Sequence, residues 1–169
     1  YTARRLVVLA ADSVLIPSAG LLVTGIVLLV IDLARTGGTK AAKDANLSDA
    51  MWIGLCQGIS VFPGLSRSGL TISAGLMSGF SRTFAVKYSY ILSIPAIIGS
   101  LIMELGQFGS PAMTVGLGFA YVLGMIVSGV TAFFVIRYCL KLVHKGRFRV
   151  FAIYCFVIGL VTLIINHML

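Results

Sequence analysis

Four apolar runs, each long enough to cross a lipid bilayer as a helix, constrain the fold of this 169-residue chain more than any other feature. A membrane-spanning helix needs about 20 apolar residues. Charged residues make up 11% of the chain, against about 25% in soluble domains, and its mean hydropathy is +1.05. The sequence therefore predicts an all-α, polytopic membrane helical bundle. We expect one membrane domain, 1–169, with spans at about 15–33, 83–103, 113–136 and 150–168.

Between the first two spans lie two apolar arms that are too short to cross a bilayer. Residues 50–62 and 70–80 flank a polar, glycine-containing segment that begins at Pro63 and Gly64. Non-helical backbone at membrane depth is tolerated only where protein or a water-filled cavity surrounds it. We therefore expect a re-entrant helix–loop–helix hairpin over about residues 50–80, with Ser48 or Asp49 capping its first helix.

The distribution of charge supports this layout. The formal net charge is +8, and the basic residues cluster in short loops beside apolar spans, as the positive-inside rule describes. No soluble basic face exists that could bind nucleic acid. The basic loops 35–49 and 137–149 are expected in the cytoplasm, and loop 104–111 outside. The chain then enters and leaves residues 50–80 on one side, as a hairpin requires.

The remaining polar residues carry simpler expectations. The cysteines lack metal-ligand spacing and are expected to fill buried apolar space, while the histidines are expected to be structural or solvated. Ser81 and Arg82 are expected to cap and anchor a helix at the cytoplasmic boundary. Glycines within 113–136 predict close helix packing. The cysteines and histidines are Cys56, Cys139, Cys155, His144 and His167, and the boundary carboxylates are Asp12, Asp32 and Glu104.

Residues 63–71 read Pro-Gly-Leu-Ser-Arg-Ser-Gly-Leu-Thr and place a charge inside apolar sequence. Such a charge is expensive in a membrane, so it indicates a functional site. Arg67 stays protonated, and its planar fork matches the oxygens of a phosphate. The alternative is an arginine that reaches to the interface or caps a neighbouring helix. The convergence of small, polar and cationic residues at a helix break favours the anion site.

The neighbours of Arg67 suit the same ligand. Hydroxyl groups can donate to phosphate oxygens, and glycines let backbone N–H groups approach them. A helix beginning near Leu70 would add positive potential at this point. The hydroxyl groups belong to Ser66, Ser68 and Thr71, and the glycines are Gly64 and Gly69.

Gln57 lies about two helical turns before the loop. It could orient a substrate group or bond a neighbouring helix, and the spacing leaves both readings open. Hydrolysis also needs a base or an activated nucleophile, and neither a carboxylate nor a histidine is close in sequence. A transporter and a non-catalytic packing subunit therefore stay open beside an enzyme.

Residues 63–71 resemble the PGxSRSGxT motif of the undecaprenyl-diphosphate phosphatase family, also called bacitracin-resistance proteins. Residues 79–95 resemble the family's next segment, and 151–154 the start of its last helix. The resemblance implies two inverted-topology repeats, each with a re-entrant hairpin, and a site where the hairpins meet. It also implies hydrolysis of undecaprenyl diphosphate to undecaprenyl phosphate and phosphate. That reaction recycles the lipid carrier for cell-wall synthesis and confers bacitracin resistance.

The resemblance also implies roles for individual residues and for partners. Arg67 and Ser66 would be catalytic, with a divalent cation, Mg²⁺ or Ca²⁺, assisting at ligands that this sequence does not reveal. The protein would be multi-pass in the bacterial inner (plasma) membrane. A homodimer and a transporter or flippase of a phosphorylated polyprenyl lipid stay open as alternatives. The implied substrate-binding residues are Ser68, Thr71, Gly64, Gly69 and Gln57.

The chain departs from the family pattern in three respects. It lacks the glutamate-rich motif, serine pair and histidine of the first repeat. Gln57 stands where that repeat has a glutamate, with Val61 near the position of the second, and Cys155 replaces an arginine common in the last helix. We therefore expect a C-terminal half whose N-terminal repeat is missing or supplied by another chain. A type 2 phosphatidic acid phosphatase is disfavoured, because no histidine follows either Ser-Arg pair as that class requires.

Overall fold

The computed structural model describes residues 13–34, 37–104, 115–145 and 147–168. This part of the chain is helical, and its longest helices are apolar enough to cross a membrane. The expectation of a polytopic helical bundle is thus confirmed, while the position of each helix in a bilayer stays a prediction. The elements are α2 (Leu15–Leu33), η1 (Ala42–Asp44), α3 (Leu47–Ile59), α4 (Arg67–Met77), α5 (Arg82–Glu104), α6 (Val115–His144) and α7 (Phe148–Met168).

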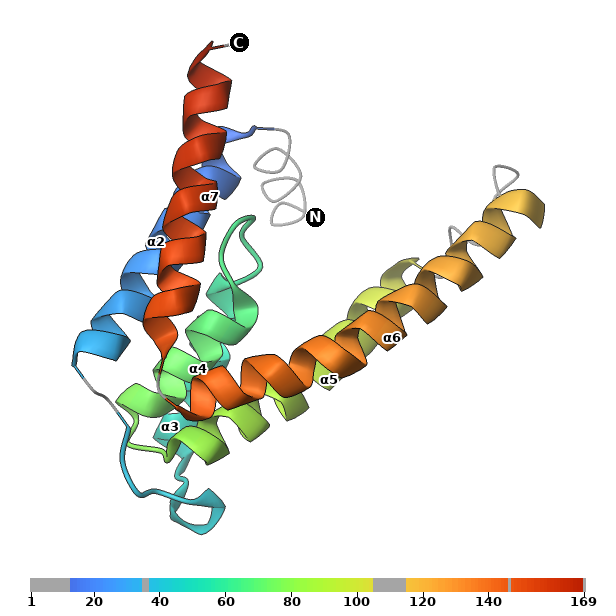
Figure 1. Ribbon diagram of the computed structural model, residues 1–169. Helices are drawn as coiled ribbons and strands as arrows, with labels where there is room; N and C mark the ends of the chain where they lie inside the picture. Colours follow the sequence, from blue (N-terminus) through green and yellow to red (C-terminus); the bar gives the residue numbers. More distant parts are fainter. Residues whose placement is uncertain (1–12, 35–36, 105–114, 146, 169) are drawn as a thin grey trace.

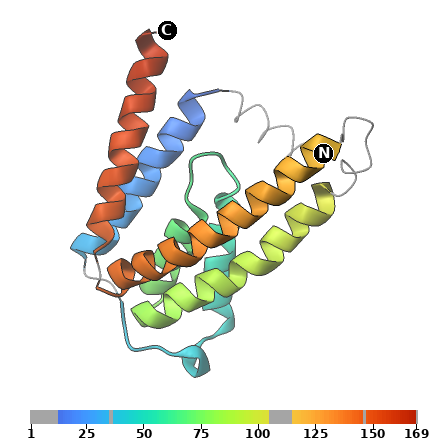
Figure 2. The same cartoon turned by 45° about the vertical axis from the view of Figure 1, so that its right-hand side comes forward.

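Helices α2 and α7 form an antiparallel pair on one side of the molecule, while α5 and α6 form a second pair that diverges from it (Figures 1 and 2). Small residues bring α2 and α7 together. A Cβ atom at Gly159 would lie 3.2 Å from the Ser18 carbonyl oxygen, and a Cβ atom at Gly25 would lie 3.3 Å from the Ala152 carbonyl oxygen. Near the start of α2, Ser18 Oγ also lies 2.8 Å from Thr162 Oγ1. Close backbone approach of this kind is how apolar helices associate in lipid, where the hydrophobic effect between them is absent.

The short helices α3 and α4 form a hairpin between the two pairs. Its loop points away from the end of the molecule where α2 ends and α7 begins (Figure 1). Backbone bonds tie its entrance to its exit: Lys40 N donates to Gly79 O at 3.2 Å, and Ser81 N donates to Lys40 O at 3.0 Å. The chain therefore enters and leaves the hairpin at one end. The side of the membrane that the loop charges predict for this end stays a prediction. Helix α4 lies at the centre, buried from Thr71 to Leu76.

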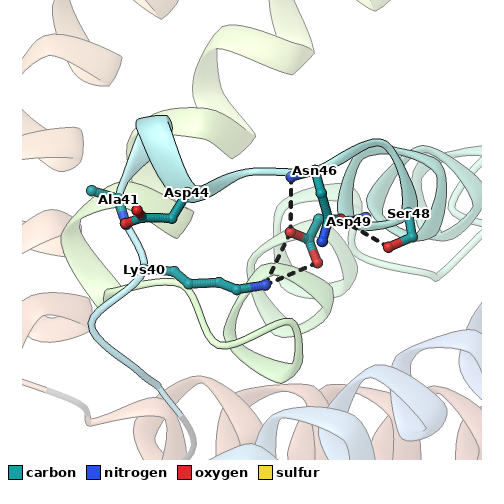
Figure 3. A network of polar contacts seen from close by, with 6 residues as sticks. All are labelled: Lys40, Ala41, Asp44, Asn46, Ser48 and Asp49. Atoms are coloured by element: carbon teal, nitrogen blue, oxygen red, sulfur yellow. Dashed lines mark hydrogen bonds and ion pairs between the residues drawn. The ribbon is translucent and has the colours of Figure 1, made fainter.

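The first helix of the hairpin is held by a polar network at its start (Figure 3). Asn46 Oδ1 accepts from Asp49 N at 2.9 Å, and Asp49 Oδ2 accepts from Asn46 N at 3.2 Å. The expected cap at Ser48 or Asp49 is therefore wrong: Asn46 is the N-cap and Asp49 closes a capping box. Burial raises the pKa of Asp49, but hydrogen bonds from Asn46 and from the Lys40 ammonium, 3.1 Å away, bring the net pKa below its ordinary value.

The expected basic loop over 137–149 is wrong for most of its length. Helix α6 continues to His144, and only residues 145–147 separate it from α7. Arg137 accordingly lies on the helix, with its guanidinium carbon 4.4 Å from the centre of the Phe133 ring. Charge counting does not report helix ends, because Arg and Lys are good helix formers. The first glycine after Ile136 is Gly146, where the helix has just ended.

Close packing of the α6 glycines is not found within the described residues. A Cβ atom added at Gly116, Gly118, Gly124 or Gly129 would meet no atom within 4 Å. No residue in the membrane-length window of α6, residues 116–138, is buried within the described part of the chain, and all but Gly118 are exposed. This face is therefore free to meet lipid or another polypeptide.

Candidate functional site

The motif at residues 63–71 forms the end of the hairpin loop and the first turn of α4. The helix begins at Arg67, three residues before the expected start near Leu70, and Ser66 is its N-cap. Ser66 Oγ accepts the Gly69 N–H at 3.1 Å. The first amides of an α-helix have no carbonyl within the helix to bond. Since the cap takes the amide of Gly69, those of Arg67 and Ser68 are left for a ligand or water.

The loop rests directly on the backbone of α2. Gly64 has φ +86° and packs so tightly that a Cβ atom there would overlap the Pro17 carbonyl. A Cβ atom at Gly20 would lie 2.5 Å from Pro63 O. Gly64 thus serves both a left-handed turn and a close backbone contact.

Thr24 on α2 holds the loop by its side chain, a role that was not predicted from the sequence. It is 1% exposed, and its Oγ1 accepts the Ser66 N–H at 3.0 Å while donating to Gly20 O at 2.9 Å. The available signal was a hydroxyl residue near two glycines within an apolar span, a pattern typical of helix contacts. Thr24 therefore positions the residue that caps α4.

Replacing Thr24 by valine should loosen this loop. Valine keeps the shape but leaves the half-buried Ser66 N–H without this acceptor, which costs about 1 kcal/mol. We expect a lower melting temperature in detergent. Thr131→Val is the matched control, because Thr131 is exposed on α6 and its Oγ1 donates to Val127 O of its own helix. Equal melting temperatures for the two variants would contradict this role of Thr24.

Arg67 lies at a polar cavity of about 320 Å³, and its side chain is exposed. A second cavity of about 330 Å³ begins at Ser66, Ser68 and Gly69 and continues between apolar side chains of α2, α4 and α7. Ser68 and Tyr90 line both cavities. The hydroxyl oxygens of Ser66 and Ser68, both predicted site residues, lie 3.5 Å apart where the two cavities meet. The polar cavity has three further hydroxyl residues that were not predicted from the sequence: Ser60, Ser89 and Ser93.

The side chains of Thr71 and Gln57 line neither of these two cavities. Thr71 is 2% exposed; its Oγ1 donates to Arg67 O at 2.8 Å and lies 2.6 Å from Ser89 Oγ on α5. Gln57 Nε2 donates to Leu92 O on α5 at 3.3 Å, so of the two readings left open, the structure shows the bond to a neighbouring helix. Gln57 Oε1 is buried without a partner among the described residues. Both side chains join the hairpin to α5.

The residues around the loop do not fit a divalent cation. Mg²⁺ and Ca²⁺ are bound mainly by carboxylate and carbonyl oxygens. No carboxylate lines either cavity in the described part of the chain. Within the same residues, no group of three His, Cys, Asp or Glu side chains is arranged to hold a metal. The donors that are present, a guanidinium, hydroxyls and amides, suit an anion.

The family model for bacitracin resistance protein BacA matches residues 4–161. The chain belongs to this family. Two relatives, both named undecaprenyl-diphosphatase, are 42% identical over 157 residues (Desulforapulum autotrophicum) and 41% identical over 146 residues (Desulfosudis oleivorans). These matches cover 90% and 86% of this chain, but 54% and 52% of the relatives. The chain thus spans about half the length of the curated relatives it matches.

The other predicted residues of this BacA-family chain have mixed outcomes. Ser81 Oγ accepts from Phe84 N at 3.3 Å, so the expected cap is confirmed. Cys155 is 7% exposed and fills the core as expected, while Cys56 is half-buried. Asp32 proves to be more than a boundary residue, because it bonds both Phe148 and Arg149 at the start of α7. Asp12 and the side chains of Glu104, Cys139, His144 and His167 lie outside the described residues.

Proposed function

We propose that this chain supplies the phosphate-binding half of an enzyme that hydrolyses undecaprenyl diphosphate to undecaprenyl phosphate and phosphate. The reaction would recycle the lipid carrier for cell-wall synthesis and so give bacitracin resistance, in the plasma (inner) membrane of a bacterium. Membership of the BacA family and the names of its relatives support this reaction class.

The observation that carries the proposal is the meeting of a cationic, hydroxyl-lined cavity and an apolar cavity at Ser68. A polyprenyl diphosphate needs both, because its head group is a dense anion and its tail is a hydrocarbon. The head group would lie against the Arg67 guanidinium and the free amides at the start of α4. The first isoprene units would follow the apolar cavity past Ile72 towards Phe151.

The residues present suit stabilisation of charge more than attack on phosphorus. As the P–O bond to the leaving group breaks, negative charge builds on the leaving oxygen, and a guanidinium beside the phosphates would stabilise that charge. Ser66 Oγ already accepts the Gly69 N–H, so its own proton remains available for donation to a phosphate oxygen. Arg67 and Ser66 would act on the phosphoryl group, and Ser68 would orient it. Thr71, Gly64, Gly69 and Gln57 would shape the site indirectly.

The base or nucleophile and the metal ligands would then come from outside this chain. An N-terminal repeat, on the same polypeptide or on another, would bring carboxylates to the hairpin loop. Such a repeat would also cover apolar helix faces that are bare here, including the glycine face of α6. A second copy of this chain is the alternative occupant of that face.

Phosphate release from undecaprenyl diphosphate in detergent tests the proposal. We would compare this chain alone with this chain co-purified with a separately expressed N-terminal repeat. Release by the pair but not by the chain alone is the expected result. Release by the chain alone would contradict the split site. Lipid movement across liposomes without phosphate release, with both parts folded and associated, would instead favour a transporter or flippase.

A further inference from the structure

A third cavity, of quite different character, lies at the opposite end of α4 from Arg67. It measures about 690 Å³ and lies between the end of α2, the start of α5 and the start of α7. Helix α4 has 11 residues, so its length separates this cavity from the hairpin loop by about 16 Å. We call it the basic cavity, after its cationic lining residues Arg82, Lys145, Arg147 and Arg149.

Charge in the basic cavity is unbalanced. Its one lining carboxylate, Asp32, is already engaged: Oδ2 lies 3.5 Å from Arg149 Nε, and Oδ1 accepts the Phe148 N–H at 3.2 Å. Among the described residues, no ion pair forms to Arg82, Lys145 or Arg147. These cations therefore lie at one cavity without a carboxylate partner there. Their mutual repulsion is unfavourable unless an anion or solvent screens it.

Basic residues that only set the orientation of a membrane protein need not lie close together. The basic residues of this cavity do lie close together. Arg82 begins α5, while Lys145 and Arg147 lie in the turn before α7, more than 60 residues later. Arg82 is half-buried, and Gly37 packs beside its stem: a Cβ atom at Gly37 would lie 3.4 Å from Arg82 Cγ. Tertiary contacts thus bring separate cations to the same cavity.

The rest of the lining is apolar, from Leu33, Val150 and Ile153. A cavity that joins cations to apolar side chains at the expected cytoplasmic end of membrane helices suits the head group and upper chain of an anionic lipid. Free phosphate would meet the same cations but would gain nothing from the apolar side chains.

We propose that the basic cavity binds a phosphate-bearing anion, the head group of an anionic phospholipid, at a site separate from the Arg67 loop. The bound phosphate bridges the start of α5 to the turn before α7 and links the two helix pairs. This inference does not depend on the proposed hydrolysis, and loss of either site leaves the other available for measurement.

The test uses the full-length protein that carries this chain, reconstituted in nanodiscs of phosphatidylglycerol or phosphatidylcholine. Retained lipid is counted by native mass spectrometry after extraction into detergent. The variant is Lys145→Gln with Arg147→Gln. The matched control is Arg137→Gln with Lys141→Gln, which removes the same charges from exposed positions that do not line the cavity. We expect retained phosphatidylglycerol to fall about tenfold or more in the variant and to change little in the control.

Two further arms separate the sources of phosphate and guard against misfolding. Inorganic phosphate is titrated into lipid-depleted protein, with melting temperature as the readout. Little effect of phosphate at concentrations where phosphatidylglycerol stabilises the protein supports the lipid head group. If inorganic phosphate and phosphatidylglycerol raise the melting temperature equally, and the variant loses both effects, the result supports a phosphate site and overturns the lipid assignment. A separate Arg82→Gln variant is measured in the same way. The proposal is overturned if this variant and the Lys145→Gln, Arg147→Gln variant are both folded and retain as much phosphatidylglycerol as the wild type.

Discussion

Arg67→Ala in the complete protein should reduce phosphate release by about 10²–10³-fold while leaving the protein folded. Removal of a preorganised group that stabilises transition-state charge costs about 10²–10³ in rate, and a guanidinium bonded to phosphate is among the stronger cases. Stability should not fall, because Arg67 is exposed and lies at the first position of α4. A cation is unfavourable at a helix N-terminus, so its removal is neutral or slightly stabilising, by about 0.3–1 kcal/mol.

Two further variants sharpen this prediction. Arg67→Lys keeps the charge and loses the planar fork, so we expect an intermediate loss. Lys87→Ala removes another exposed cation, on α5 and outside both cavities, and should leave turnover unchanged. Normal turnover in folded Arg67→Ala would refute the assigned role. A large loss of stability would instead support the alternative in which Arg67 anchors or caps the helices.

Gly64→Ala should destabilise the protein more than any other single change in the loop. Gly64 has φ +86°, a conformation that costs a residue with a Cβ atom about 1–3 kcal/mol. The added methyl group would also overlap the Pro17 carbonyl, and overpacking of this kind typically costs about 1–3 kcal/mol more. Because the clash is with backbone, no side chain can rotate to relieve it. The loop would leave α2, and the melting temperature and phosphate release would fall together.

Gly58→Ala is the matched control for that prediction. It lies six residues earlier, in the last turn of α3, and a Cβ atom there would meet nothing within 4 Å. Alanine is favoured over glycine by up to about 1 kcal/mol in a helix interior and by less in a last turn, so this variant should be neutral or slightly stabilised. Unchanged stability of Gly64→Ala, measured by thermal unfolding beside this control, would show that the hairpin loop does not depend on its contact with α2.

Local sequence was a good guide to the helices and a poor guide to their ends. Long apolar runs predicted α2, α5 and α7 to within a few residues. Helix α6 ends eight residues beyond the predicted end at Ile136, because the basic residues that follow, which suggest a loop, also favour helices. The start of α4 was missed by three residues, because Ser66 was read as a ligand-binding hydroxyl rather than as an N-cap.

For the candidate site too, some residues could be predicted from the local sequence and others could not. Arg67, Ser66 and Ser68 could be selected from the motif alone, because residue type and an unexpected charge in apolar sequence carry that information. The roles of Thr71 and Gln57 could not, since a hydroxyl or amide bonds whatever packs against it. In this protein both contact α5. Thr24, which holds the cap residue, lies 42 residues from Ser66 and becomes visible only when α2 packs on the loop.

The sequence by itself determined the class of the protein, because hydropathy and periodicity are local properties that add along a chain. It also marked the hairpin break and the cationic motif within it. Only the tertiary structure decided that Gly64 lies on Pro17, that Ser68 joins a polar cavity to an apolar one, and that Arg82 shares a cavity with Lys145 and Arg147. Each depends on residues distant in sequence, and their proximity follows from how whole helices pack, which no local pattern encodes.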